Sequence, residues 1–441
     1  MVENQDQQMI KTRLAWMLLP PLLLSAGICR AQLASIEAID QGLRRKAEAG
    51  LFSGAVLIAK GDTILLDKGY GSASYPQGPV NGPETVFRIG SLTKQFTAAA
   101  ILKLRDDGKL SLEDPICQYM RPCPSGWSGI RVSQLLNHTS GIPSYTAAPG
   151  YAQMKGNAVA ASSLLALVES LPLEFEPGSG FDYSDSGYAL LGWIVERVSG
   201  VSYAEYLKAS ILDPLSLLHT GYGNPPTPGA SASGYVGEAG SLRPAQSADA
   251  SVAFSSAGMY STTDDLGQWV RALTGGRVIS SRSQTEMFTP GPEDFGYGWI
   301  IPKNVWPRTY LHLGEIAGFE SAIFVLPDLG VTSVVLSNIQ GTDADAIAAA
   351  NALAGAYAEF EGAYALAAPK VTLRVFIKGK TLTAQVPRRT TLPLDYVSGD
   401  AFVSLRDTPS ELRVRFKRDA SGQVIGVELQ QFGKLYSGIK P

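Results

Sequence analysis

A serine and a lysine three residues apart, Ser91 and Lys94, stand where the sequence predicts the start of a helix. Apolar residues recur at helical spacing from Phe96 to Leu104, and Gly108 follows as a typical helix end. At this spacing the serine hydroxyl and the lysine ammonium lie on one face of the first turn. A lysine whose pKa is lowered by burial can take the serine proton. The pair therefore indicates covalent catalysis by Ser91.

The Ser-x-x-Lys pattern is a weak signal by itself, because a chain of 441 residues is expected to contain about one or two matches by chance. Ser437 and Lys440 form a second match near the C-terminus. Ser91 could instead be an ordinary helix N-cap, whose side chain accepts a hydrogen bond from the backbone. The catalytic hypothesis therefore needs partners from other parts of the chain.

Tyr183 is a candidate partner in a glycine-rich loop between two expected helices, at residues 158–170 and 188–198. Functional side chains often lie on such loops. The pKa of a phenol falls near a lysine ammonium, so that a tyrosine there can act as an acid or a base. The alternative is a tyrosine that only packs against the helix that follows it.

The three histidines are His138, His219 and His312, and they stand far apart in the sequence. We expect His138, which follows a short apolar helix, to bond to the backbone and shape a turn rather than take part in chemistry. His312 lies on an expected strand at residues 310–314, where the nearby glycine lets the backbone approach a ligand closely. The histidines form no metal-ligand cluster, so we expect no metal and no cofactor.

The elements that must position these residues are helices and antiparallel strands. We expect helices at residues 36–49 and 346–360, strands at 295–300, and hairpins formed by 54–59 with 63–66 and by 321–326 with 331–336. Ser261 or Thr262 is expected to cap a helix that runs to Leu273. Residues 225–251 are rich in glycine, alanine, serine and proline, which predicts a long surface excursion.

The pattern changes after residue 369, where short alternating runs predict a small all-β module. These runs lie at residues 371–375, 381–386, 412–416 and 424–429. The module contains no catalytic grouping, and its expected roles are to cover the main domain, make an oligomer contact or shape the site entrance. The sequence therefore predicts an α+β domain at residues 32–362, with helices on an antiparallel sheet, and a β-rich module at residues 363–441.

The N-terminus has the features of a secretory signal peptide. A basic stretch precedes an apolar run at residues 14–28, which Pro20 and Pro21 interrupt. The run is shorter than the roughly 20 residues that a membrane-spanning helix needs. We therefore expect a leader at residues 1–31, cleaved after Ala31 rather than kept as an anchor, and a periplasmic or extracellular protein without a membrane span.

Composition supports a globular chain, with 45% hydrophobic and 17% charged residues. The net charge of -3 gives no electrostatic reason to expect nucleic acid or an acidic membrane surface as a partner. Without the leader, the remaining cysteines are Cys117 and Cys123, which could form a local disulfide in an oxidising compartment. Neither has a histidine nearby in the sequence, so neither is a good catalytic candidate.

Three motifs occur in a particular order: Ser-Leu-Thr-Lys at 91–94, Tyr-Ser-Asp at 183–185 and His-Leu-Gly at 312–314. In this order the chain resembles the serine hydrolases grouped with class C β-lactamases and penicillin-binding proteins, for which Ser-x-x-Lys is a signature. Further similar stretches lie at residues 135–142, 257–266 and 295–299, so that the resemblance spans about residues 40–345.

The resemblance implies a fold and a set of roles. Ser91 would be acylated, Lys94 would help to remove its proton, and Tyr183 would shuttle protons as base and then as acid. The backbone N–H groups of Ser91 and Glu315 would form the oxyanion hole, where losing one donor typically costs about 10²–10³ in rate. The fold would be an antiparallel sheet flanked by helices with a helical subdomain, and the C-terminal module would be a small lipocalin-like barrel, as in some relatives.

Two departures from the family pattern bear on the substrate. Asp185 stands where the family usually has asparagine, and its carboxylate could pair with Lys94 and raise the pKa of that lysine, or hold a substrate ammonium. His312 and Gly314 stand where β-lactamases carry Lys-Thr-Gly, and the histidine removes a permanent cation that would bind the carboxylate of a β-lactam. This pattern resembles the esterase-like and D-amino-acid peptidase members more than true β-lactamases.

The sequence thus predicts an exported serine hydrolase that acts through an acyl-enzyme on a small ester, peptide or other amide, with weak or absent β-lactamase activity. The alternative is a sensor or binding protein that is acylated without turnover, or an inactive relative. An α/β-hydrolase is excluded because the chain contains no Gly-x-Ser-x-Gly motif. An oligomer that forms through the C-terminal module is a further possibility.

Overall fold

The structure is a computed structural model that describes residues 36–225, 231–246, 248–303, 305, 307–367, 370–378, 381–385, 391–398, 401–404, 412–420, 423–431 and 434–440. The expected leader at residues 1–31 lies outside the described residues. Contacts within the chain divide the described residues into two compact units. The first unit comprises residues 44–349, and the second comprises residues 36–43 and 350–440.

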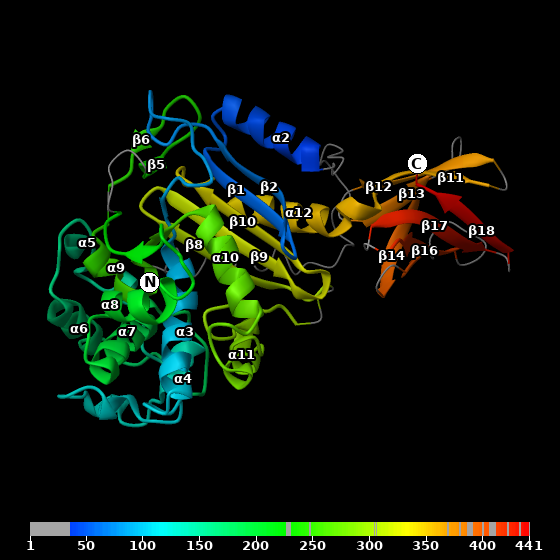
Figure 1. Ribbon diagram of the computed structural model, residues 1–441. Coiled ribbons are helices and arrows are strands. Elements are labelled where there is room, and N and C mark those ends of the chain that lie inside the picture. The colour runs from blue at the N-terminus through cyan, green and yellow to red at the C-terminus, as the bar shows by residue number, and fades with distance from the viewer. Residues whose placement is uncertain are drawn as a thin grey trace. The chain divides into compact units, whose positions relative to one another are not determined.

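A five-stranded antiparallel sheet forms the centre of the first unit, with the strand order β2-β1-β10-β9-β8 (Figure 1). Its strands are β1 (Gly54–Lys60), β2 (Thr63–Tyr70), β8 (Tyr310–Ile316), β9 (Phe319–Leu326) and β10 (Val331–Ser337). Both predicted hairpins are confirmed, as β1–β2 and β9–β10. Every residue of β9 and β10 is buried, as expected for strands covered on both faces.

One face of this sheet packs against α10 (Thr263–Thr274), which contacts β1 and β10. The side chain of Thr262 accepts a hydrogen bond from the backbone N–H of Asp265 at 3.2 Å, so Thr262 is the N-cap, one of the two caps predicted. The chain also forms α2 (Ile36–Glu48) and α12 (Ala344–Tyr357), close to the helices predicted at 36–49 and 346–360.

A largely helical region separates β2 from β8 along the chain, and α3 lies at its centre against α7 and α9 (Figure 1). Besides α10, its helices are α3 (Thr93–Asp106), α4 (Val132–Leu136), α5 (Tyr151–Met154), α6 (Ala161–Glu169), α7 (Asp185–Ser199), α8 (Tyr203–Leu207), α9 (Ala250–Ala257) and α11 (Ser281–Met287). A three-stranded sheet in the order β3-β7-β4 accompanies them. It comprises β3 (Phe87–Arg88), β4 (Gly221–Tyr222) and β7 (Met259–Ser261). The unit is therefore an α+β domain, as predicted.

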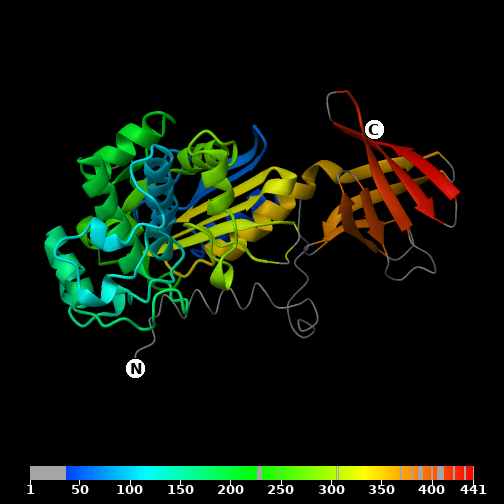
Figure 2. The ribbon, with the colours of Figure 1, turned by 90° about the horizontal axis from the view of Figure 1, so that it is seen from below.

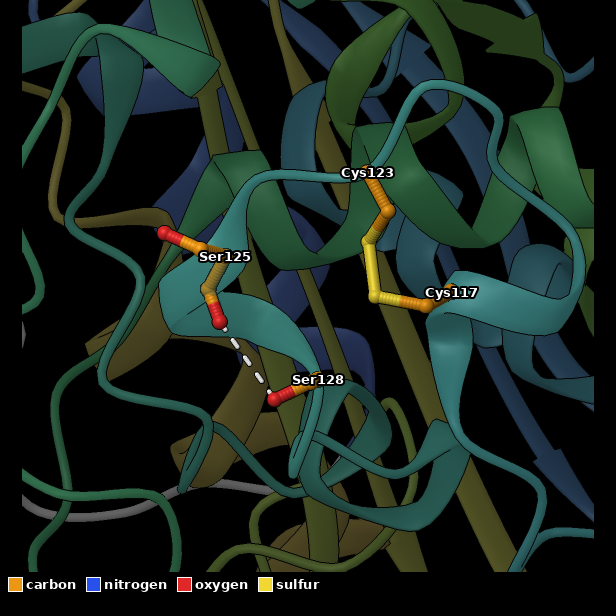
Figure 3. Close-up of a disulfide and its surroundings, with 4 residues drawn as sticks. All are labelled: Cys117, Cys123, Ser125 and Ser128. Atoms are coloured by element: carbon orange, nitrogen blue, oxygen red, sulfur yellow. Dashed lines mark hydrogen bonds between the residues drawn. A yellow bond between two sulfur atoms is a disulfide. The ribbon is translucent and has the colours of Figure 1, made fainter.

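A disulfide joins Cys117 and Cys123 in the loop between α3 and α4 (Figure 3). The two cysteines are six residues apart, so the bond closes a small local loop. In the next turn, the Ser128 hydroxyl donates a hydrogen bond to the Ser125 carbonyl at 3.3 Å. The sequence did not settle whether Cys117 and Cys123 pair, and in the structure they do.

The second unit contains a closed barrel in which β11 to β18 pair in sequence order, each antiparallel to the next, and β18 returns to β11 (Figure 2). Its strands are β11 (Gly362–Leu366), β12 (Val371–Lys378), β13 (Thr381–Gln385), β14 (Leu392–Ser398), β15 (Ala401–Ser404), β16 (Leu412–Arg418), β17 (Val424–Gln431) and β18 (Lys434–Ile439). This up-and-down order is that of eight-stranded lipocalins. The predicted all-β module is confirmed.

Aromatic side chains fill much of the barrel interior. The rings of Phe402 and Phe416 lie 5.6 Å apart, and Phe360, in the 3-10 turn before β11, lies 4.6 Å from Phe416. Tyr364 is buried as well and lies 5.6 Å from Phe416. The barrel is therefore held together by an apolar, aromatic core.

One prediction about local structure was wrong. Residues 295–300 form a bend with isolated bridges rather than a strand, because Gly298 has a positive φ of 72° and lies against the backbone of α3 at Lys94. The stretch 225–251 lies largely at the surface where the structure describes it, as predicted, but it also contains short strands. It forms β5 (Tyr235–Val236) and β6 (Arg243–Pro244), and Tyr235 is buried.

None of the helices in the described ranges combines the length and the apolar character needed to cross a lipid bilayer.

Candidate active site

Ser91 lies in a short 3-10 helix, η1 (Gly90–Leu92), directly before α3. This differs slightly from the prediction, which placed Ser91 in the first turn of the helix itself. Hydrogen bonds made by residues before and after Ser91 hold this turn in place. The Thr93 hydroxyl donates to the Gly90 carbonyl at 2.7 Å, and the Ile89 N–H donates to the Met259 carbonyl of β7 at 3.1 Å.

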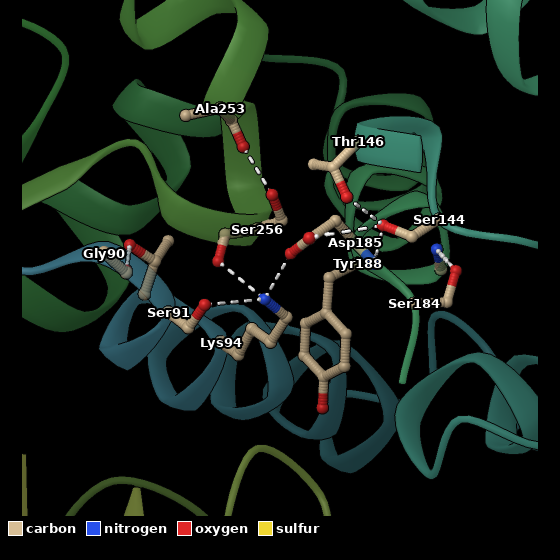
Figure 4. A network of polar contacts seen from close by, with 12 residues as sticks. Gly90, Ser91, Lys94, Ser144, Thr146, Ser184, Asp185, Tyr188, Ala253 and Ser256 are labelled. Carbon is tan, nitrogen blue, oxygen red and sulfur yellow. Dashed lines mark hydrogen bonds and ion pairs between the residues drawn. The ribbon is translucent and has the colours of Figure 1, made fainter. Parts of the chain in front are cut away.

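Lys94 is fully buried one turn after Ser91. Its ammonium donates hydrogen bonds to Ser91 Oγ at 3.2 Å, Asp185 Oδ1 at 2.6 Å and the Ser256 carbonyl at 3.1 Å (Figure 4). An ammonium group has three N–H donors, and all three have acceptors here. The predicted closeness of Ser91 and Lys94 is confirmed, and the geometry is that of a charged lysine.

The electrostatics of Lys94 agree with this geometry. Burial alone would lower the pKa of Lys94, but the charge of Asp185 and hydrogen bonds to Asp185 and Tyr183 outweigh burial and raise it above its ordinary value. Asp185 therefore pairs with Lys94 and raises its pKa, which was one of the two alternatives for this carboxylate. A lysine that holds all its protons cannot accept the serine proton in the resting state.

Asp185 begins α7, where a negative charge interacts favourably with the helix N-terminus. Its second oxygen, Oδ2, accepts a hydrogen bond from Ser144 Oγ at 3.3 Å, and its backbone N–H donates to the same hydroxyl at 3.2 Å. The preceding residue, Ser184, caps α7 by accepting a hydrogen bond from the Gly187 N–H. Both carboxylate oxygens thus have partners, which favours the pairing role over binding of a substrate ammonium.

Tyr183 lies beside this ion pair. The Lys94 ammonium is 4.7 Å from the centre of its ring, and the side chain is buried. Burial raises the pKa of Tyr183 above its ordinary value, although the Lys94 charge and hydrogen bonds to Lys94 and Ser91 act in the opposite direction. The resting site therefore contains a neutral phenol next to a lysine cation.

His138 shapes the turn that supports Tyr183, as predicted. It has a positive φ of 62°, its Nδ1 accepts a hydrogen bond from the Ser184 N–H at 3.1 Å, and its carbonyl accepts one from the Asp182 N–H at 3.0 Å. The imidazole ring lies 4.5 Å from the Tyr183 ring. Burial and the charge of Lys94 hold the pKa of His138 well below its ordinary value, so the ring is uncharged.

His312 is buried on β8, with its ring centre 6.5 Å from that of Tyr183. Its Nδ1 donates a hydrogen bond to the Leu313 carbonyl at 2.7 Å. Burial and the Lys94 charge lower the pKa of His312 to about 3, so the imidazole is uncharged near neutral pH. The third motif therefore brings a neutral ring behind the site and supplies no cation.

Two glycines allow the backbones of Ser91 and Glu315 to meet. A Cβ atom on Gly314 would lie 2.2 Å from the Ile89 carbonyl oxygen and 3.1 Å from the Ser91 nitrogen. A Cβ atom on Gly90, whose φ is 50°, would lie 2.8 Å from the Glu315 nitrogen. Real Cβ atoms do not come this close, so only glycine fits at these two positions. The two backbone nitrogens thus lie in adjacent segments, as an oxyanion hole requires.

A cavity of about 290 Å³ opens beside Ser91. Of the predicted residues, Ser91, Asp185 and Glu315 line it, whereas Lys94, Tyr183 and His312 do not. Lining residues that the sequence did not single out include Tyr145, Tyr151, Lys155, Gln246, Ser256 and Gln340. This volume suits a small substrate.

Part of the Lys94 environment had no signal in the sequence. Helix α9 is interrupted at Phe254, whose φ of 38° and ψ of −139° are not helical. After this break the Ser256 carbonyl accepts a hydrogen bond from Lys94, and the Ser255 carbonyl accepts one from the Thr97 hydroxyl at 2.7 Å. Every residue type carries a carbonyl, so only the fold shows which one reaches the lysine.

Comparison with known proteins is consistent with this geometry. The protein-family model described as Beta-lactamase matches residues 37–358. The Putative penicillin-binding protein PbpX of Bacillus subtilis (strain 168) is 33% identical over 296 residues, which are 66% of this chain and 71% of that protein.

Solved structures show the same similarity. The octameric penicillin-binding protein homologue from Pyrococcus abyssi has a TM-score of 0.62 and 25% identity, covering 92% of this chain and 99% of that chain. The D-stereospecific amidohydrolase from Streptomyces sp. has a TM-score of 0.60 and 26% identity, covering 71% of this chain and 97% of that chain.

Proposed function

The chain belongs to the beta-lactamase family and is a serine hydrolase, and from this premise we propose that it cleaves small esters or amides through an acyl-enzyme on Ser91. The observation that carries the proposal is the position of the Ser91 hydroxyl. It lines a small cavity, 3.2 Å from the Lys94 ammonium and next to the backbone of Glu315. The Ser91 and Glu315 N–H groups would stabilise the oxyanion of the tetrahedral intermediate.

In the proposed reaction Ser91 Oγ attacks the carbonyl carbon, and the bond from that carbon to the leaving group breaks. The serine proton passes through Tyr183 to the leaving group, and a water molecule then releases the acyl group from Ser91. Lys94 and Tyr183 are both protonated at rest, so one of the two must lose a proton before attack. The Lys94 cation would stabilise the phenolate that forms.

We propose that ester or D-amino-acid amide substrates are preferred to β-lactams. Two observations support this preference. His312 is buried and uncharged, so β8 offers no cation at the place where β-lactamases carry the lysine of Lys-Thr-Gly. The similar structures include a D-stereospecific amidohydrolase. Gly314 and His312 would shape the strand at the edge of the site rather than bind a substrate charge.

The location and assembly of the protein are also proposals. The basic and apolar N-terminal sequence supports a cleaved leader at residues 1–31 and export. The Cys117–Cys123 disulfide fits an oxidising compartment. We assign residues 32–362 to the hydrolase domain and 363–441 to the barrel module. An oligomer is supported by the octameric homologue, which matches 92% of this chain.

The test is hydrolysis of p-nitrophenyl butyrate, a D-alanyl anilide and a chromogenic cephalosporin by the wild type and by Ser91→Ala. We expect turnover of the ester or the anilide by the wild type and a loss of at least about 10³-fold in the variant. Equal rates in both proteins would contradict the proposal. A wild type that forms one covalent adduct per chain without turnover would indicate the sensor alternative instead.

A further inference from the structure

Three charged side chains line the cavity beside Ser91, namely Lys155, Asp185 and Glu315. Asp185 is neutralised by its ion pair with Lys94. Glu315 accepts a hydrogen bond from the Gln340 side chain. Lys155 differs from both, because no carboxylate of the described residues lies within ion-pair distance of its ammonium. A basic residue without a counter-ion in the described part of the chain therefore lines the cavity.

Lys155 is held at the cavity wall by its own backbone. It follows the last residue of α5, and its carbonyl accepts a hydrogen bond from the Asp249 N–H at 3.0 Å. The Asp249 carboxylate is occupied by the N–H and hydroxyl of Ser251, at 2.9 and 2.6 Å, where it caps α9. The Asp249 carboxylate thus caps the N-terminus of α9. Tyr151 stands four residues before Lys155 and lines the same cavity, so one face of this short helix is turned towards it.

A lysine in the lining of the Ser91 cavity matters because the third motif, on β8, supplies no positive charge. His312 is buried behind the site and uncharged, so β8 offers no positive charge to a ligand in the cavity. A partly buried lysine gains free energy when a carboxylate of the ligand binds to it, because a charge-assisted hydrogen bond replaces hydration. Lys155 supplies such a charge from α5.

We propose that Lys155 binds a carboxylate of the substrate, so that the preferred substrates are small esters or amides that carry an anionic group, such as the free end of a short peptide. This inference rests on the proposed function of the Ser91 site, because it assigns the substrate class of that same cavity. Lys155 is thus a specificity-determining residue, and the reaction at Ser91 proceeds without it on neutral substrates.

Two matched pairs of substrates test the inference. The first is p-(butanoyloxy)benzoate and its methyl ester, which form the same acyl-enzyme and differ by a carboxylate on the leaving group. The second is p-nitrophenyl hydrogen glutarate and p-nitrophenyl pentanoate, which differ by a carboxylate on the acyl chain. We expect the wild type to prefer the carboxylate member of at least one pair by about tenfold in kcat/KM.

Variants at Lys155 should change this preference. Lys155→Met should bring the ratio of kcat/KM for the two members of the pair close to one, and Lys155→Arg should keep most of the wild-type ratio. Lys109→Met removes one positive charge from an exposed lysine outside the cavity and serves as the matched control. The absence of a preference in both pairs, or a preference that survives in Lys155→Met, would overturn the inference.

A binding measurement separates this inference from the proposed function. Titration calorimetry on Ser91→Ala and on Ser91→Ala/Lys155→Met gives the affinity for each carboxylate and its neutral counterpart without turnover. A carboxylate preference that depends on Lys155 supports the inference even if the wild type hydrolyses none of the esters. Conversely, Ser91-dependent hydrolysis without such a preference in binding or kcat/KM leaves the proposed function intact and contradicts the role of Lys155.

Discussion

The two units of the chain bury different kinds of side chain. Around Ser91 the first unit buries Lys94, Asp185, His138 and His312, each no more than 7% exposed. The described strands of the barrel bury only Thr383 and Ser404 among polar residues, beside apolar and aromatic side chains. Buried polar groups cost free energy unless they are hydrogen-bonded. The first unit therefore keeps a hydrogen-bonded polar interior where chemistry is proposed, and the barrel has the interior of a structural module.

Lys94→Met should have the largest effect on both activity and stability. Removing the cation takes the proposed proton-transfer partner from Ser91 and Tyr183, so kcat/KM should fall by at least about 10³-fold. It also leaves Asp185 buried without its partner, which should lower the free energy of unfolding by about 3–5 kcal/mol. Ester hydrolysis and denaturant unfolding measure the two effects.

The double variant Lys94→Met/Asp185→Asn separates these effects. The neutral amide needs no cation, so most of the lost stability should return while activity stays low. A double variant as unstable as Lys94→Met alone would show that the ion pair does not account for the stability loss.

Phe416→Ala tests whether the barrel is a purely structural module. The ring contacts Phe360, Tyr364 and Phe402, so the barrel should lose about 3–5 kcal/mol on unfolding. Ester hydrolysis below the melting temperature should stay within about twofold of the wild type, because no group of the Ser91 site changes. Calorimetric melting and kcat/KM check both parts. Loss of activity parallel to the loss of the barrel would contradict a purely structural module.

Asp185→Asn tests whether the ion pair sets the pH dependence. Lys94 and Tyr183 both have pKa values above their ordinary ones, so kcat/KM of the wild type should rise with pH through the alkaline range. The Asp185 charge is the largest influence that raises the pKa of Lys94. Its removal should move the rise to lower pH and increase kcat/KM several-fold near neutral pH. A pH profile that keeps the wild-type midpoint would show that the carboxylate does not control this titration.

A smaller effect is expected at Asp67, which shows the cost of a half-buried carboxyl next to another carboxylate. Burial, then a hydrogen bond and the charge of Asp264, raises its pKa from 3.8 to about 7, against a hydrogen bond from Thr263. Because the folded-state pKa is the higher one, this carboxyl stabilises the fold fully below pH 3.8 and loses that effect as pH rises to about 7.

Asp67→Asn should therefore gain stability relative to the wild type between pH 4 and 7, by on the order of 1–2 kcal/mol after allowance for solvent exposure. Unfolding by denaturant across this range measures the gain. Asp62→Asn, a change at an exposed aspartate of the same hairpin, is the matched control. A gain that does not vary with pH, or that appears equally in the control, would contradict the assignment to Asp67.

Local patterns predicted most of the first unit. The spacing of Ser91 and Lys94 fixed their closeness, and alternating apolar residues around short turns gave both hairpins of the sheet. In the barrel, β12, β13, β16 and β17 were predicted because they alternate clearly. The other four strands were missed, because β11 and β15 are short, β14 contains Pro393, and β18 has little alternation.

Long-range contacts account for what the sequence did not show in the site. The second oxygen of Asp185 is bound by Ser144, which is 41 residues away, and the Ser256 carbonyl reaches Lys94 only because α9 breaks at Phe254. Burial lowers the pKa of Lys94 and the Asp185 charge raises it. Which effect is larger likewise depends on the distance between the two side chains in the folded chain. Sequence spacing thus identifies the reacting groups but not their protonation states.

The most direct test of the account is to identify the acylated residue. The wild type and Ser91→Ala are mixed with p-nitrophenyl butyrate, quenched in acid during turnover and digested for mass spectrometry. If Ser91 is the nucleophile, the wild type carries one butanoyl group on the peptide that contains Ser91, and the variant carries no adduct. A butanoyl group on another residue, or unchanged turnover by Ser91→Ala, would contradict this role of Ser91.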